Sequence, residues 1–86
     1  MSEENRVPAD FAWISLVVGD CFYEIAQVKA DGREENLLLA IKAYKRALSF
    51  YTQERFPSDY AMIQDKLVNV QASLAAQVKQ NTGAGP

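Results

Sequence analysis

Apolar side chains recur at alternating intervals of three and four positions through most of the chain, which is the spacing of amphipathic α-helices. The first such stretch runs from about Pro8 to Ala30. Its apolar stripe consists of Phe11, Ile14, Val18, Cys21, Ile25 and Val28. Pro8 suits the first helical position, and Asp10 lies in the first turn, where the helix dipole favours an anion. We predict a helix here, with its stripe facing the core.

Two further helices are predicted on the same grounds, from about Arg33 to Glu54 and from about Pro57 to Lys79. The stripe of the second is Leu37, Ile41, Tyr44, Leu48 and Tyr51, with Ala40 and Ala47 beside it. The stripe of the third is Tyr60, Ile63, Leu67, Val70, Leu74 and Val78. No segment alternates with a period of two, so the fold class predicted is all-α.

The boundaries of these helices also have sequence signals. Asp31-Gly32 ends the first helix, and Asp31 followed by Glu34 is an acidic form of the capping box that would begin the second. Phe56-Pro57 ends the second helix, because a residue before proline is held away from helical geometry. The predicted organisation is a flexible N-terminus over residues 1–7, a helical domain over 8–79 and a disordered tail over 80–86.

The first and third helices repeat each other at an offset of 49 positions. Pro8-Ala9-Asp10-Phe11-Ala12-Trp13-Ile14 matches Pro57-Ser58-Asp59-Tyr60-Ala61-Met62-Ile63, and the same offset pairs Val18 with Leu67. A repeat of this length built from helix pairs is the signature of an α-solenoid, in which each unit buries its apolar face against its neighbours. This chain holds about one and a half such units.

The segments Asp31 to Leu37, Ala40 to Leu48 and Tyr51 to Pro57 resemble the long-repeat tetratricopeptide arrays of bacterial signalling proteins. The resemblance covers residues 32–75 closely and the first helix more loosely. It implies a helical hairpin plus one further helix, with packing roles for Gly19, Ala40, Tyr44, Ala47 and Leu48. The third helix departs from the family, with Val68 where a small residue is usual and Gln71 where an aromatic is usual.

In such arrays the first helix of each unit lines a concave groove, and this resemblance supplies the candidate binding residues. They are Trp13, Leu16, Asp20, Tyr23 and Glu24 on the first helix, with Met62, Asp65, Lys66, Asn69 and Ser73 on the third. Trp13 and Tyr23 offer large, stiff apolar surfaces with a polar handle. A clamp for a peptide's terminal carboxylate is disfavoured, because its basic and asparagine positions are Leu16 and Asp20 here.

Self-association is expected on two grounds. A chain of 86 residues buries only about 60% of its unfolded surface, so a marginal core gains from further coverage. The first helix is also apolar nearly all round, since Trp13, Leu16, Val17 and Tyr23 lie off its main stripe. We expect a homo-oligomer, with a dimer favoured in which the third helix packs against another copy.

Charge and composition exclude several other classes of function. The nine basic residues are scattered among eleven acidic ones, and Lys42, Lys45 and Arg46 form too small a cluster for a nucleic-acid footprint. The chain has no histidine, and its single cysteine, Cys21, is expected to be a small buried hydrophobe. No catalytic, cofactor-binding or metal-ligating residues are identified. We therefore expect a protein that is not an enzyme.

A membrane role is also not expected from the sequence. The longest apolar stretch, Phe11 to Val18, is broken by Ser15 and followed by Gly19-Asp20, too short to span a bilayer. The acidic start Ser2-Glu3-Glu4 is the opposite of a signal peptide's basic leader. A cytoplasmic location follows by default.

These observations predict an adaptor or assembly module that binds a peptide or protein through its helical groove and self-associates. The alternative is a purely structural oligomerisation unit, or a fragment of a longer array, without a ligand of its own. The two hypotheses differ in whether the surface of Trp13 and Tyr23 stays open once the copies assemble.

Overall fold

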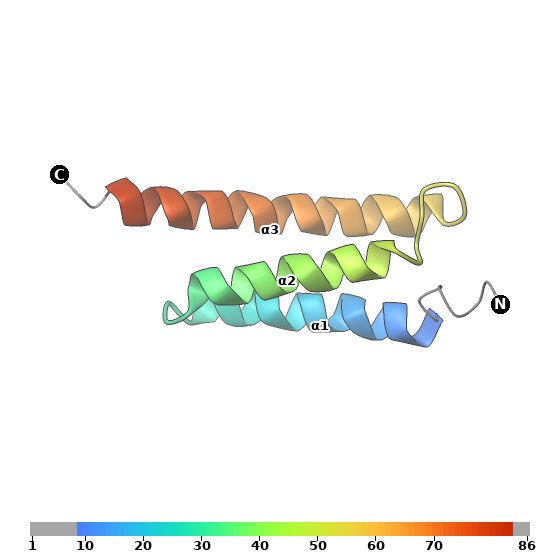
Figure 1. Cartoon of the computed structure of the whole chain (residues 1–86), viewed down its shortest axis with the longest axis horizontal. Helices are drawn as coiled ribbons and strands as arrows, with labels where there is room; N and C mark the ends of the chain where they lie inside the picture. Colours follow the sequence, from blue (N-terminus) through green and yellow to red (C-terminus); the bar gives the residue numbers. More distant parts are fainter. Residues whose placement is uncertain (1–8, 84–86) are drawn as a thin grey trace.

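The computed structural model describes residues 9–83 of the chain, and these form three α-helices with no strand among them. Helix α1 spans Ala9–Val28, α2 spans Arg33–Leu48 and α3 spans Pro57–Gly83. Helix α2 lies between the other two and packs against both, in an elongated molecule of 55 × 21 × 20 Å (Figure 1). The predicted all-α class is confirmed.

The turn between α1 and α2 differs from the capping box that the sequence predicts. The N-cap of α2 is Gly32, in the left-handed conformation at φ 70°, and it makes no side-chain cap hydrogen bond. Glycine fits this position because it has no Cβ to clash there. Arg33 donates from Nε to the carbonyl oxygen of Ala26 at 2.6 Å, so a side chain of α2 satisfies the last turn of α1.

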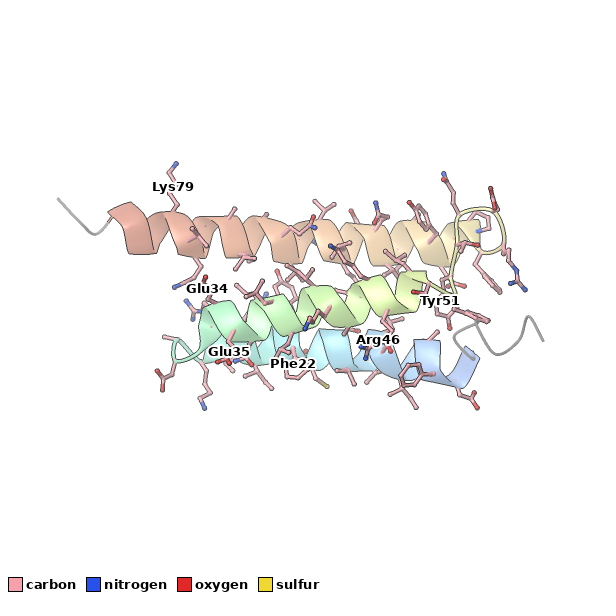
Figure 2. The ribbon with its side chains drawn as sticks, in the orientation of Figure 1. Phe22, Glu34, Glu35, Arg46, Tyr51 and Lys79 are labelled. Carbon is pink, nitrogen blue, oxygen red and sulfur yellow. The ribbon has the colours of Figure 1, made fainter. Side chains whose placement is uncertain are left out.

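Helix α2 ends at Leu48, earlier than the predicted Glu54. Three aromatic rings, those of Phe50, Tyr51 and Phe56, contact one another with centroids 5.1–5.5 Å apart. This cluster holds the link to α3 in a compact loop, whose backbone hydrogen bonds include Tyr51 N–H to Ala47 O and Phe56 N–H to Thr52 O. Figure 2 shows Tyr51 where α2 meets this loop. Rings that could have extended the stripe of α2 pack on one another instead.

The core is centred on α2, as its stripe predicts. Tyr44, Leu37, Ile63 and Val70 are its largest fully buried side chains, and Leu67 is buried beside them. Small buried residues line α2 as well, namely Ala40, Ala43 and Ala47. They allow neighbouring helices to approach closely. Ala40 and Ala47 were predicted beside the stripe, whereas Ala43 was not.

The predicted core stripe of α1 is wrong, because all six of its members are exposed: Phe11, Ile14, Val18, Cys21, Ile25 and Val28. The buried face of α1 consists instead of Ala12, Ser15, Leu16, Gly19 and Ala26. A Cβ on Gly19 would lie 2.7 Å from Cε1 of Tyr44, so the tyrosine ring sits directly on the α1 backbone. Small residues set the buried face because they let this bulky ring approach.

Helix α3 follows its predicted stripe through Leu74 and then continues past the hairpin. Val78 is exposed, and the C-terminal end of α3 extends beyond the turn that joins α1 and α2 (Figure 1). The helix runs to Gly83, so residues 80–83 are helical rather than part of a disordered tail. The predicted flexible segment 1–7 and the remaining tail residues 84–86 lie outside the described residues.

Candidate protein-interaction surfaces

The groove between α1 and α3 is crossed by a polar cluster that joins all three helices. Asp20 of α1 accepts a hydrogen bond from the hydroxyl of Tyr44 on α2. The same carboxylate oxygen lies 3.2 Å from Nζ of Lys66 on α3, in a partly exposed ion pair. Asp20 and Lys66 are two of the predicted groove residues, and the structure brings them together. Asp20 and Lys66 therefore form an ion pair with each other.

The hydroxyl of Tyr44 is held in its neutral, donating form. Burial raises the pKa of Tyr44 above its ordinary value, and the hydrogen bond to Asp20 and the negative charge of that carboxylate raise the pKa further. A neutral phenol donates while a carboxylate accepts, so the polarity of this contact is fixed. The cluster therefore acts as a positioning contact between α1 and α2, with Lys66 completing it from α3.

A second contact crosses the groove nearer the C-terminal end of α1. The hydroxyls of Tyr23 and Ser73 lie 3.4 Å apart. Beside them is a pocket of about 310 Å³, lined by Tyr23, Ala26, Gln27, Arg33, Leu37, Ser73, Ala76 and Gln77. The polar rim and apolar floor of this pocket suit a short stretch of peptide. Tyr23 and Ser73 come from the predicted groove, whereas the other lining residues were not predicted.

The remaining predicted groove residues divide into one that is buried and several that are open. Leu16 is only 4% exposed and belongs to the core, which corrects its assignment to the groove surface. On the wheel of α1 it lies next to the buried residue Ala12, on the side that packs against the other helices. The exposed members are Trp13, Glu24, Met62, Asp65 and Asn69. Trp13 is 57% exposed, which is unusual for a residue with such a large apolar side chain.

An extended apolar surface lies on the side of α1 that is not buried against the other helices, and we call it the outer face. It consists of Phe11, Trp13, Ile14, Val17, Val18, Cys21, Ile25 and Val28. The seven residues other than Cys21 range in exposure from 37% at Val18 to 83% at Val28. The guanidinium of Arg46 lies 5.7 Å from the ring centre of Phe11 and borders this face from α2 (Figure 2).

The internal repeat gives this outer face a specific meaning. At the offset of 49, four outer-face residues correspond to α3 residues that pack in the core. The pairs are Ile14 with Ile63, Val18 with Leu67, Cys21 with Val70, and Ile25 with Leu74. Because those α3 residues pack in the core around α2, the outer face of α1 has the residue pattern of a surface that receives a helix.

The repeat can also be used to compare the side of α1 that packs against α2 with the equivalent positions of α3. On α3 these positions form no apolar packing surface. The positions of Leu16, Gly19 and Phe22 in α1 correspond to Asp65, Val68 and Gln71 in α3, and all three are exposed. An acid, a bulkier side chain and an amide thus replace a leucine, a glycine and a phenylalanine. These positions of α3 are therefore more polar than their α1 counterparts, and they face solvent.

A shallow hollow of about 470 Å³ lies on the outer face itself. It is lined by Cys21, Glu24, Ile25, Gln27 and Val28, all on α1. The exposure of Cys21 corrects the prediction that this thiol is buried. Within residues 9–83 no group of three or more His, Cys, Asp or Glu side chains is placed to hold a metal ion. What the outer face offers is apolar contact area.

The segment Asp10–Val28 is also long and apolar enough to cross a membrane, by length and composition alone. This differs from the expectation based on Phe11 to Val18, because the helix continues past Gly19-Asp20 and takes in Phe22, Ile25 and Val28. Within α1, however, Asp20 is engaged with Tyr44 and Lys66. The helix therefore has one side fitted to the other two helices and one side that is uncovered.

Comparison with known proteins adds no assignment: no protein-family model matches the chain, and neither a curated protein nor a solved structure matches it. The resemblance to tetratricopeptide arrays stays a prediction.

Proposed function

We propose that this chain is a protein-interaction module of helical-repeat type without catalytic activity, and that the outer face of α1 is its main binding surface. The observation that carries this proposal is the exposure of eight mostly large apolar residues along one side of α1. Contiguous apolar surface of this extent marks interaction sites in soluble proteins. The occupant is a helix, because the matching α3 residues pack in a core centred on α2.

Three features of the structure support a helix rather than an extended peptide on this face. Its residues follow the 3,4 spacing along a single helix, which suits a helix laid alongside it. No sheet edge is present in residues 9–83 that could pair with an extended strand. The hollow at Cys21, Ile25 and Val28 is open to an apolar side chain from an incoming helix.

The experiment is a selection of helix-forming peptides against the intact chain, immobilised so sparsely that neighbouring copies do not meet. Peptides with apolar residues at 3,4 spacing are expected to be enriched. Val18→Asp should weaken their binding by about tenfold or more, because an unpaired carboxylate would enter an apolar contact. Val68→Asp is the matched control, since Val68 is an exposed valine on α3 that lies outside the outer face. Peptides that bind Val18→Asp as well as wild type would refute the assignment of the surface.

The groove between α1 and α3 is a second candidate surface, favoured by the pocket beside Tyr23 and Ser73. A peptide bound there would hydrogen-bond to groups such as Gln27 and Gln77 on its rim. It would also have to compete with the contact between Tyr23 and Ser73. The groove is therefore less accessible to a peptide than the outer face.

The two surfaces can be separated with one variant each. Ser73→Leu should fill the groove pocket and reduce the binding of any peptide that uses it, while leaving peptides on the outer face unaffected. Val18→Asp should do the opposite. If neither variant changes the binding of any selected peptide, the purely structural alternative is favoured.

A further inference from the structure

We propose that the occupant of the outer face is a second copy of this chain, with α1 packed antiparallel against the partner's α1 about a two-fold axis between Val18 and Cys21. This inference rests on the proposed function, because it names the partner of the same surface. It differs from the dimer expected from the sequence, which used the third helix.

The spacing of the outer-face stripe carries the inference. Six outer-face residues, from Phe11 to Val28, follow one another at steps of 3, 4, 3, 4 and 3 positions. This series of steps is the same in both directions along the helix. An antiparallel partner therefore presents the same spacing. Phe11 meets the partner's Val28, Ile14 meets the partner's Ile25, and Val18 meets the partner's Cys21. A stripe that matches its own reverse is the self-complementarity that a two-fold interface requires.

The outer face is an extended apolar surface. Seven of its eight residues are 37–83% exposed and Cys21 is exposed as well, and a contiguous apolar patch of this kind marks an interaction site. Trp13 and Phe11 are residue types that are enriched in protein–protein interfaces. The contact would cover most of the apolar surface that the three helices leave open on α1.

The shape of the outer face fits the same arrangement. The hollow lies toward one end of α1 and is lined by the apolar residues Cys21, Ile25 and Val28 together with the polar residues Glu24 and Gln27, whereas Phe11 and Ile14 are exposed nearer the other end. Antiparallel pairing places the partner's Phe11 and Ile14 over this hollow, and the symmetry repeats the fit at the other end. Side chains from one helix thus enter a depression on the other.

An open head-to-tail assembly is disfavoured by the far side of α3. A chain of copies would need α3 to receive the next outer face, yet its exposed positions hold Asp65 and Gln71. Burying an unpaired acid against valine and isoleucine is costly. The closed dimer leaves this side of α3, and the groove between α1 and α3, facing solvent.

The test is light scattering coupled to size-exclusion chromatography on the intact chain over a wide range of concentrations. A mass of twice 9.6 kDa that does not grow further is expected. Val18→Asp should give a monomer with unchanged helical circular dichroism, whereas Val68→Asp should remain a dimer. A monomeric wild type, or a species whose mass rises steadily with concentration, would overturn the proposal.

Cross-linking provides a readout that does not depend on an interface variant folding. About the proposed axis, the two Cys21 residues lie about 4.5 Å apart along the helix direction. A short bis-maleimide should therefore join the two copies through their only cysteines. The matched control, Cys21→Ser combined with Val68→Cys, should give no covalent dimer. A dimer that cross-links through position 68 and not through 21 would place the interface on α3 instead.

These experiments distinguish a failure of the proposed dimer from a failure of the proposed helix-binding function. A monomer that still selects helical peptides through Val18 refutes the second copy but keeps the helix-binding function. A monomer that co-sediments with vesicles of phosphatidylcholine and phosphatidylglycerol, and loses this binding in Val18→Asp, assigns the outer face to a lipid surface and refutes both.

Discussion

At the scale of single residues, Asp20 of α1 is a side chain that contacts both of the other helices. Its carboxylate accepts from the buried hydroxyl of Tyr44 and pairs with Lys66. The two contacts should contribute differently to folding stability because they are buried to different extents. Tyr44 is fully buried, whereas Lys66 and Asp20 have side chains 36% and 42% exposed. The hydrogen bond should therefore matter more than the ion pair.

Replacing Asp20 by Ala should lower the free energy of unfolding by about 1–3 kcal/mol, because the buried hydroxyl of Tyr44 loses its acceptor. Replacing Lys66 by Met should cost less than about 1 kcal/mol, since the ion pair is partly solvated. Urea unfolding of both variants measures this order. Tyr44→Phe combined with Asp20→Ala is the control and should recover part of the loss. Equal losses in the two single variants would contradict the ranking.

The raised pKa of Tyr44 makes a prediction for alkaline pH. The neutral phenol is favoured in the folded state, so the unfolded chain releases its proton first as the pH rises through the ordinary value of 10.0. The contribution to stability is thus fully present below pH 10.0 and is lost progressively above it. Unfolding measured from pH 8 to pH 11 should show a steeper alkaline decline for wild type than for Tyr44→Phe. Parallel curves would show that Tyr44 has no raised pKa.

At the scale of elements, the pairing of α1 with α2 is set by a glycine under a tyrosine. The ring atoms of Tyr44 lie 2.7–3.1 Å from where a Cβ on Gly19 would be. The small residues Ala12, Ser15 and Ala26 continue this face along α1. Close approach of the two helices, rather than the size of the α1 side chains, therefore decides which face of α1 is buried.

Gly19→Ala tests this packing. In a free helix the change would stabilise by about 1 kcal/mol, because alanine has the higher helix propensity. Here the added methyl must displace a fully buried ring, and overpacking costs about 1–3 kcal/mol. We expect net destabilisation, measured by thermal or urea unfolding. In a Tyr44→Leu background the same change should be neutral or stabilising. Stabilisation by Gly19→Ala in the wild-type background would mean that the ring can move aside easily.

The elements show why part of the fold was predictable and part was not. The stripe of α2 through Leu48 and that of α3 from Ile63 to Leu74 pack in the core, since each helix is apolar on one side and its period alone picks out the buried face. Tyr51 lies beyond the end of α2 and Val78 is exposed. In α1 the same periodicity predicted the wrong face to be buried. Nearly every position from Phe11 to Val28 is apolar or small, so period does not distinguish the two faces. The place of Gly19, read together with Tyr44, was the available signal.

At the scale of the whole molecule, stability should depend on concentration if the outer face is covered by a second copy. Dimerisation stabilises the folded state by mass action, so dilution should lower the midpoint of thermal unfolding. Val18→Asp should have a lower midpoint that no longer changes with dilution, and Val68→Asp should behave as wild type does. A wild-type midpoint that is constant across dilution would contradict the covered face.

The sequence by itself determined three helices, the core stripe of α2 and most of that of α3, because periodicity and turn residues are local properties. It also supplied the repeat at offset 49, from which the meaning of the outer face follows. Only the tertiary structure decided which side of α1 is buried, that Leu16 lies in the core, and that Asp20 meets Lys66. These depend on how closely α2 approaches α1, and that distance is set by two residues 25 positions apart, Gly19, which has no side chain, and Tyr44, whose ring packs on it. A large apolar surface was therefore left open on the face that the sequence alone would have buried.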